Sequence, residues 1–280
     1  MITSIVVPID DGHDSERSIP VAGALARMTG ATMELVSVDP VGSAPERSQR
    51  RLDEVAARIP RGIAVSTTVE DTADSVAVAL ATLDRDQGAI LCLATHGRGA
   101  LVALALGSVT NGLVDETTMP VLIIGPRCID SGPSDLMAPA VAALDGSEVD
   151  HEVMDAAARW VTATGAPLTI TTVVDRPSEP EAWDDADRIL AWGEERASAL
   201  AVPVTTSVVA ATGAEEGILR AVEGRVGCVV VGSHRRGRVT RLVFGSTVTR
   251  LTQHAPCPVL VAARTHSAPT SAPMTCSLDA

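Results

Sequence analysis

The chain contains no lysine, since all 22 of its basic residues are arginines. A Walker-type phosphate loop and a Schiff-base enzyme each require a lysine, so both classes are excluded. The formal net charge of −13 argues against a protein that holds a nucleic-acid backbone with basic clusters. With three Trp, one Phe and no Tyr among 280 residues, few side chains are available to stack on bases.

Cysteines and long apolar runs are also scarce. The five cysteines are an odd number and form no Cys-x-x-Cys pair, so neither a disulfide framework nor a zinc site is indicated. We expect buried or incidental thiols and no metal site. No apolar stretch approaches ~18 residues, and no basic region precedes the strand-like N-terminal segment, so we expect a cytoplasmic protein without a membrane partner.

Small and branched apolar residues are abundant, and hydrophobic residues make up 46% of the chain. Cores built from Ala, Val, Leu and Ile suit parallel strands that are buried between helices. A length of 280 residues suffices for two domains of about 100 to 150 residues each. Strand-like runs alternate with helical periodicity along the whole chain, which predicts βαβ units and a parallel sheet.

The sequence therefore predicts an α/β fold with two tandem Rossmann-like domains, each an open five-stranded parallel sheet with helices on both faces. The expected strands are Ile2–Ile9, Thr32–Val38, Ile63–Val69, Ala89–Leu93, Val121–Ile124, Val141–Leu144, Thr169–Val174, Val204–Val209, Cys228–Val231 and Val259–Val261. The expected helices are Asp14–Thr29, Glu46–Ile59, Thr72–Asp84, Ser108–Thr118, Glu148–Thr162, Trp183–Leu200, Ala214–Val222 and Thr247–His254.

A stretch rich in Pro, Gly and Ser, Gly125–Pro139, has no periodicity and is typical of a linker. We expect a first domain over residues 1–126, a linker over 127–137 and a second domain over 138–264. Residues 265–280 are rich in Ser, Thr and Pro and are expected to be a disordered tail.

The two halves are copies of one unit. Shifting residues 94–126 by 138 positions gives ten identities in 33, and a shift of 135 near the start pairs Asp10 with Asp145. The matched positions lie in loops and at element ends that follow strands. Ligands of open α/β sheets bind at the carboxyl ends of strands, so the repeat preserves a candidate site as well as a fold.

A glycine-serine pair opens a helix in each half, at Gly107-Ser108 and at Gly245-Ser246. Glycines let the backbone approach a ligand closely, and the free amides at Ser108 and Val109 favour phosphate, together with the positive end of the helix. The corresponding residues of the second half are Ser246 and Thr247. A glycine-tolerant loop with a serine helix cap is the simpler interpretation of one copy, and its recurrence favours phosphate binding.

These residues resemble the universal stress protein family, whose nucleotide-binding members carry G-x-x-G, nine residues and then G-[S/T] after the fourth strand. The resemblance covers both halves and leaves the linker and the tail outside. Each half departs from the pattern once: Ala94 replaces the first glycine of one motif and Arg235 the second glycine of the other. Arg235 could occlude its pocket or place a guanidinium against phosphate. The matching positions are Gly97, Gly107, Ser108, Gly232, Gly245 and Ser246.

The resemblance also implies roles for residues that end the first two strands. The first strand ends in Pro8-Ile9-Asp10, and Asp10 and its counterpart Asp145 would contact the nucleotide. The backbones of Val38 and Val173 would meet the adenine. From the residues alone, an Asp at a strand end is more often a turn or cap residue. Asp10 could also accept a ribose hydroxyl or help to hold Mg on the phosphates, and spacing does not choose between these roles.

Three functions follow from these expectations. The first is an ATP-binding regulatory protein of the stress response, in which each domain holds one nucleotide between its first and fourth strands. No convincing nucleophile, base or metal cluster is present, so any hydrolysis would be slow and incidental. ATP, AMP and cyclic nucleotides are not distinguished.

The second function is an interaction module without nucleotide, which Ala94 and Arg235 favour. The resemblance implies that the last strands, Val121–Ile124 and Val259–Val261, pair about a two-fold axis. The two domains would then form an intramolecular pseudo-dimer, which could associate further into a homodimer. The third function is a nucleotide-consuming enzyme, which would show turnover that is lost in Asp10→Ala and Asp145→Ala.

Overall fold

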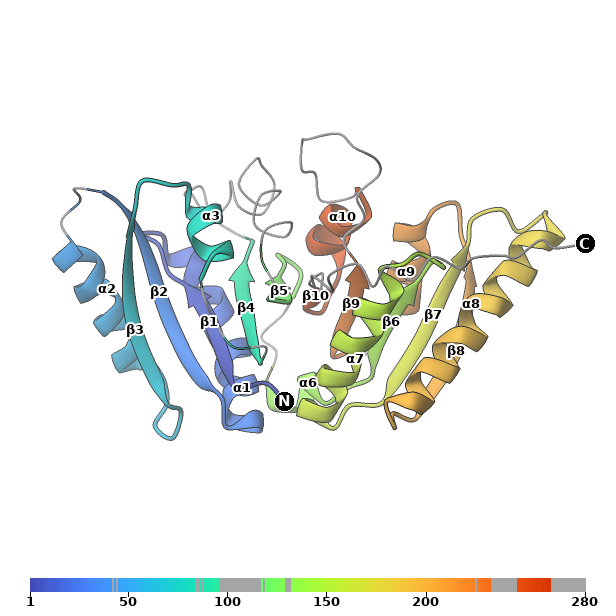
Figure 1. Ribbon diagram of the computed structural model, residues 1–280, viewed down its shortest axis with the longest axis horizontal. Helices are drawn as coiled ribbons and strands as arrows, with labels where there is room; N and C mark the ends of the chain where they lie inside the picture. The colour runs from blue at the N-terminus through green and yellow to red at the C-terminus, as the bar shows by residue number, and fades with distance from the viewer. Residues whose placement is uncertain are drawn as a thin grey trace, which may run out of the picture.

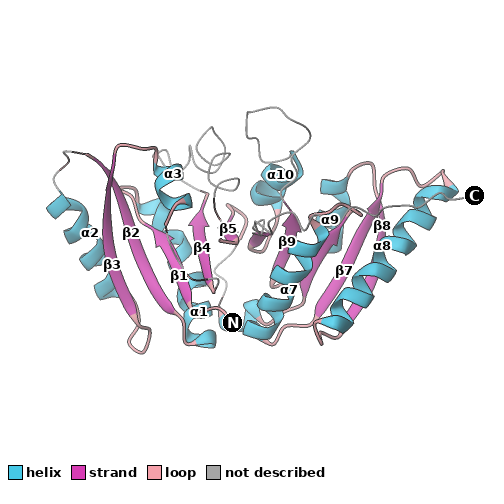
Figure 2. Cartoon of the chain, viewed as in Figure 1, coloured by secondary structure: helices cyan, strands magenta, loops and turns pink. Residues whose placement is uncertain are grey.

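A computed structural model describes residues 1–41, 43, 45–83, 86, 88–95, 117, 119–128, 132–224, 226–232 and 246–262. In this part of the chain, strands from both halves form one continuous ten-stranded sheet, with helices on its two faces (Figures 1 and 2). The α/β fold predicted from the alternating periodicity is confirmed.

Each half contributes five strands to the sheet. Those of the first half are β1 (Ser4–Pro8), β2 (Thr32–Pro40), β3 (Val65–Thr72), β4 (Ala89–Ala94) and β5 (Val121–Ile124). Those of the second half are β6 (Ala140–Leu144), β7 (Leu168–Val174), β8 (Val204–Ala210), β9 (Cys228–Gly232) and β10 (Val259–Ala262). The strand order is β3-β2-β1-β4-β5-β10-β9-β6-β7-β8. The second half therefore has the same strand arrangement as the first half, read from the opposite end.

The helices cover both faces of the sheet, which carry two separate apolar cores. They are η1 (His13–Ser18, a 3-10 helix), α1 (Ile19–Thr29), α2 (Pro45–Arg58), α3 (Val76–Ala81), α6 (Pro133–Leu136), α7 (Asp150–Thr164), α8 (Pro180–Ala199), α9 (Ala214–Ala221) and α10 (Ser246–His254). One core lies under α1, α2, α7 and α8, and the other lies under α3, α9 and α10. Alternate strand residues point to opposite faces, so buried strands rich in Val, Ile and Leu supply both cores.

The halves join through their last strands, which lie at the centre of Figure 1. β5 and β10 are antiparallel, with Leu122 opposite Leu260, whereas the other strand pairs of the described sheet are parallel. On one face α1 packs against α7, so a single apolar core runs across the junction. The expected pairing of these strands within the chain is therefore present.

Two helices begin later than their periodicity indicates. Within the expected helix Asp14–Thr29, the first turn is the 3-10 segment η1, and α1 begins at the residue before Pro20. Proline fits the first turn of an α-helix and cannot supply an amide further along. In the expected helix Thr72–Asp84, Thr72 ends β3, and α3 begins only after Ser75, whose hydroxyl caps it.

The linker is more structured than its composition indicates. It contains the short helix α6, in which Leu136 is fully buried. The amide of Gly227, just before β9, donates to the carbonyl of Pro139 at 2.9 Å, and a Cβ at Gly227 would lie 2.6 Å from the carbonyl oxygen of Ala138. The connection is therefore packed against both halves, because α6 also contacts α1. The boundaries at 126 and 138 stay predictions.

Two other expectations lie outside the described residues, namely nearly all of the helix Ser108–Thr118 and the tail 265–280. Of the helices that the structure describes, none combines the length and apolar character that a membrane crossing needs.

Candidate functional site

The described site residues that end or follow the first, second and fourth strands of each half lie at neighbouring carboxyl ends of the sheet. In the first half β1 pairs with both β2 and β4, so Asp10 after β1 lies between Val38 of β2 and Ala94 of β4. In the second half β6 pairs with both β7 and β9 in the same way. In each half, the order of the strands reverses direction at the central strand, β1 or β6. Open α/β sheets bind ligands at such a topological switch point.

In the first half, Asp10 organises a tight loop. Its Oδ1 accepts the amide of Gly12 at 2.9 Å, and its own amide donates to Oγ of Ser15 at 3.3 Å. The Ser15 hydroxyl, which is buried, donates in turn to the carbonyl of Gly12 at 2.9 Å. Asp10 is thus a turn residue, as the simpler interpretation expects. A carboxylate has several acceptor positions, so this role leaves room for a ligand hydroxyl.

The loop after β6 has the same design. Oδ1 of Asp145 accepts the amide of Ser147 at 3.1 Å. The amides of Asp145 and Gly146 donate to the two carboxylate oxygens of Asp150, at 3.3 and 2.8 Å. Asp150 is the first residue of α7 and is only 4% exposed. Motif reading missed Asp150, although the shift of 135 that pairs Asp10 with Asp145 also pairs Ser15 with Asp150.

The two valines lie slightly inside their strands, because β2 runs on to Pro40 and β7 to Val174. Their position still leaves part of the backbone open. The ladder between β1 and β2 ends with Pro8 opposite Val36, so Val38 lies beyond it on the β1 side. The ladder between β6 and β7 ends at Thr172, one residue before Val173. The backbone of each valine can therefore offer a carbonyl or an amide to a ligand there.

Gly232, the first glycine of the second motif, has a packing role of its own. A Cβ at this position would lie 2.5 Å from Cγ1 of Val149, the residue just before α7. At the corresponding position of the first half, Ala94 carries that methyl group and packs partly buried against the core. The departure at Ala94 is therefore accommodated by the first half, whereas in the second half a methyl group at Gly232 would collide with Val149 unless a neighbour shifts.

Of the two glycine-serine pairs, the structure describes only Ser246 of the second pair. α10 begins at Ser246, with Thr247 next, so the second pair opens a helix as predicted. The other predicted site residues of the glycine motifs lie outside the described residues, namely Gly97, Gly107, Ser108, Val109, Arg235 and Gly245. Their contact with phosphate stays a prediction.

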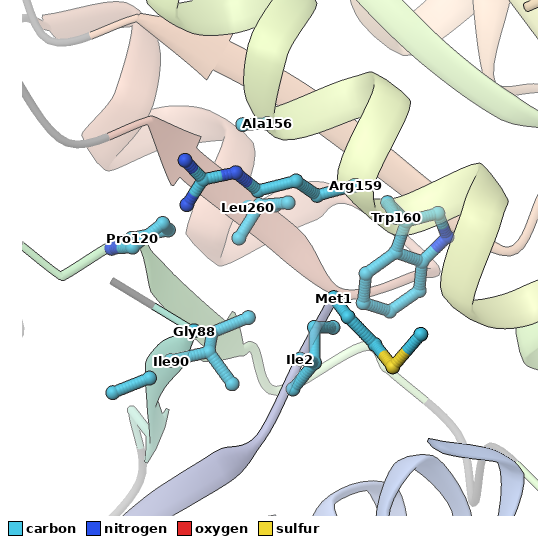
Figure 3. A pocket seen from close by; sticks show the side chains of 10 residues that line it. Met1, Ile2, Gly88, Ile90, Pro120, Ala156, Arg159, Trp160 and Leu260 are labelled. Carbon is cyan, nitrogen blue, oxygen red and sulfur yellow. The ribbon is translucent and has the colours of Figure 1, made fainter. Parts of the chain in front are cut away.

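A hollow with about 330 Å³ of empty space, part of it open to solvent, lies at a different place (Figure 3). It is lined by residues at the amino ends of first-half strands, such as Ile2, Gly88 and Pro120, and by Arg159 and Trp160 of α7. Because this is the edge opposite Asp10 and Ala94, the hollow is not part of the candidate site.

Buried thiols lie in the sheet and its cores. Burial raises the pKa of Cys92 and of Cys228 well above the ordinary value, and raises the pKa of Cys257 to about 12. A thiol with a raised pKa is a poor nucleophile at neutral pH. Among the described residues, no group of three or more His, Cys, Asp and Glu side chains is arranged to hold a metal ion.

Comparisons with known proteins match this architecture. The model of the universal stress protein family matches residues 1–125 and again residues 137–263. A universal stress protein of Mycolicibacterium smegmatis is 26% identical over 289 residues, which cover 92% of this chain and 96% of the relative. One of Mycobacterium tuberculosis is 30% identical over 191 residues, or 63% of this chain and 62% of the relative. The crystal structure of a universal stress protein from Archaeoglobus fulgidus is similar in fold, with a TM-score of 0.71 at 21% identity, and covers 95% of this chain and 100% of its own.

Proposed function

Because this chain belongs to the universal stress protein family, as a member with two domains in tandem, we propose that it binds ATP and acts as a regulator in the stress response. One nucleotide would lie at the carboxyl ends of β1 and β4, and another at those of β6 and β9. The observation that supports this most is the repeated loop at Asp10 and Asp145. Each loop lies between two strand ends, at the topological switch point of its half.

The parts of a nucleotide fit the chemistry of the residues in each half. The open backbone of Val38 or Val173 suits the hydrogen-bonding edge of adenine. The carboxylate of Asp10 or Asp145 suits a ribose hydroxyl, and it would also suit Mg bound to the phosphates. The glycine-serine pairs would bring backbone amides and a helix N-terminus to the phosphates.

A second candidate function is an interaction module of the same fold that binds no nucleotide. The antiparallel pair of β5 and β10 favours it, because these strands already serve as an interface between the two halves. Arg235, in place of a motif glycine, favours it for the second half. A homodimer and a cytoplasmic location stay predictions under both functions.

The deciding experiment is mass spectrometry of small molecules released from freshly purified protein, followed by calorimetric titration with ATP. We expect co-purified adenine nucleotide and up to two binding sites. Asp10→Ala and Asp145→Ala should each weaken one site about 10-fold to 100-fold, since a hydrogen bond to a charged group contributes about 1.5–3 kcal/mol. Asp187→Ala, an exposed change on α8, serves as the control with the same loss of charge.

Two results would contradict ATP binding as the function. Protein that carries no nucleotide and releases no heat with millimolar ATP would favour the interaction module. ATP turnover that disappears in both Asp10→Ala and Asp145→Ala would instead identify an enzyme.

A further inference from the structure

The second half ends the sheet with β8, whose outer edge is not paired within the described sheet (Figure 1). Its sequence, Val-Thr-Thr-Ser-Val-Val-Ala, contains no charged residue and no proline. The strand at the opposite edge, β3, carries Glu70 and Asp71. Charges and prolines are common means of blocking an edge strand, so β8 lacks the protection that β3 has.

Alternate residues of β8 direct their backbone groups away from the sheet. The amide of Ala211, just after β8, donates to the carbonyl of Val174 on β7 at 3.1 Å. In a parallel ladder, every second residue of a strand bonds to one neighbour and the residues between them face the other way. The residues of β8 that face β7 are therefore 205, 207 and 209, and those that face outward are 204, 206, 208 and 210.

The outward groups of Thr206 and Val208 are open to an added strand. Within the described chain, their amides and carbonyls have no backbone partner on the outer side. The outward carbonyl of Ala210 accepts Nη1 of Arg220 at 3.0 Å, in agreement with the direction assigned to it. In an antiparallel pair, each open residue exchanges both an N–H and a C=O bond with the residue opposite. This edge can therefore hold an extended peptide by its backbone.

The flank of α8 beside this edge is acidic. Oγ1 of Thr206 donates to Oε1 of Glu194 at 3.3 Å, which places Glu194 next to the edge. Asp187 lies about two helical turns earlier on the same stripe of α8, and both carboxylates are exposed. The two arginines of α8 pair instead with Asp185 and with Asp155 of α7, so they do not neutralise this flank.

We propose that β8 binds an extended basic segment of a partner protein, which adds an antiparallel strand to the sheet. Residues directly opposite in an antiparallel pair project on the same face. The residues that pair with Thr206 and Val208 therefore project toward α8, and lysine or arginine at those positions meets Asp187 and Glu194. The residues between them project toward α9 and are uncharged. Nucleotide is not needed for this pairing, which therefore stands or falls separately from ATP binding.

A second copy of the chain fits this edge less well than a basic segment. Antiparallel pairing of two β8 strands is related by an axis perpendicular to the sheet, so both copies of α8 lie on one face. The acidic flanks of the two helices then meet across the joint, and like charges repel. The chemistry of the edge therefore favours a partner of opposite charge.

The test uses a capped, fluorescent peptide of seven residues, the length of β8, in which lysine alternates with threonine. Titration of the full chain, followed by fluorescence anisotropy, should show saturable binding that weakens with salt. A peptide with glutamate in place of lysine should not bind. N-methylation of the lysine amides should abolish binding, because those amides are directed at β8. N-methylation of the threonine amides, which are directed away, should leave the affinity unchanged.

The backbone of β8 is tested by Thr206→Pro, which removes an outward amide. Proline is tolerated at an edge position whose amide makes no bond within the sheet, so the fold should be retained, as circular dichroism would show. The affinity for the lysine peptide should fall on the order of tenfold. Thr206→Val keeps the amide and loses only the hydroxyl, and it should bind within about twofold of the unmodified protein.

The charge of the flank is tested by combining Asp187→Asn with Glu194→Gln. This variant should bind the lysine peptide about fivefold more weakly at low ionic strength, with a smaller dependence on salt. The matched control combines Asp53→Asn with Glu54→Gln, which removes the same two charges from exposed positions of α2. The control should leave the affinity unchanged.

Several results would overturn the proposal. One is the absence of binding at millimolar peptide. Another is equal binding of the two N-methylated peptides, or the reverse of the expected order, and this comparison decides the question if Thr206→Pro does not fold. An equal loss of affinity in the α2 control would show nonspecific attraction to an acidic protein. A dimer in analytical ultracentrifugation that dissociates in Thr206→Pro would show that a second copy occupies the edge.

Discussion

Replacing Gly232 with alanine tests whether the first glycine of the second motif is needed for packing. A methyl group at the end of β9 would lie 2.5 Å from Cγ1 of Val149 and 3.3 Å from Cγ2 of Val153. Ordinary van der Waals contact begins at 3.4 Å, so the shortest contact must lengthen by about 1 Å. Val149 is β-branched and precedes α7 directly, so its side chain has few alternative rotamers.

The expected net effect is a loss of stability. Overpacking of this kind costs about 1–3 kcal/mol. Replacing glycine with alanine within a strand recovers about 0.5–1 kcal/mol of backbone entropy. Gly232→Ala should therefore lower the free energy of unfolding by about 1–2 kcal/mol.

Urea unfolding can measure this loss of stability in the second half, where Gly232 lies. All three tryptophans, Trp160, Trp183 and Trp192, lie in the second half, so their fluorescence reports the unfolding of that half. Val149→Ala removes the methyl groups that would collide. In a double-mutant cycle, Gly232→Ala should therefore cost about 1 kcal/mol less in the Val149→Ala background.

The first half supplies a matched control, because Ala94 already stands at the corresponding position. Ala94→Gly should destabilise by about 0.5–1 kcal/mol, as expected for a glycine within a strand, and circular dichroism can follow it. A neutral or stabilising Gly232→Ala, or a cycle without coupling to Val149, would refute the packing argument. The glycine would then be needed for another reason, such as close approach of a ligand to the backbone.

The remaining predictions concern stability and reactivity elsewhere in the chain. Gly217→Ala should destabilise the protein, because the new methyl group would lie 2.5 Å from a valine of β7. Gly23→Ala should raise the free energy of unfolding in urea by about 1 kcal/mol, because the nearest side-chain atom to its new methyl group is 3.5 Å away. The pKa of Glu216 is lowered first by a hydrogen bond from a threonine hydroxyl and then by a nearby arginine. The stability that its carboxylate contributes to the folded protein is therefore complete above the ordinary glutamate pKa of about 4.3, and it is lost as the pH falls through the lowered value. Thermal melts of Glu216→Gln should therefore lie below those of the unmodified protein at pH 7 and converge with them in acid, and a constant difference would contradict this assignment. Cys92 and Cys257 should resist iodoacetamide at pH 8 in the native protein and react in urea, as peptide mass spectrometry would show, because burial raises the pKa of both thiols.

The sequence by itself determined the order and type of the elements, because these depend on local periodicity. The apolar runs that became β1, β4 and β9 are buried on both sides, which their continuous apolar character requires. The repeat that pairs Asp10 with Asp145 placed both loops at strand ends, and topology then brought them to the switch points of the sheet. The start of α10 at Ser246 lies within one residue of the start expected from the sequence, Thr247.

Only the tertiary structure decided the features that depend on contacts between distant segments. The antiparallel pairing of Leu122 with Leu260 joins strands that are far apart in sequence, and their residues alone do not specify that register. The packing of Val149 on Gly232 gives a motif glycine a steric role that no spacing reveals. The buried carboxylate of Asp150 looks like an ordinary helix-start residue in the sequence. Its position beneath the loop of Asp145 appears only when strand, loop and helix are folded together, because burial and hydrogen-bond geometry are properties of the packed chain.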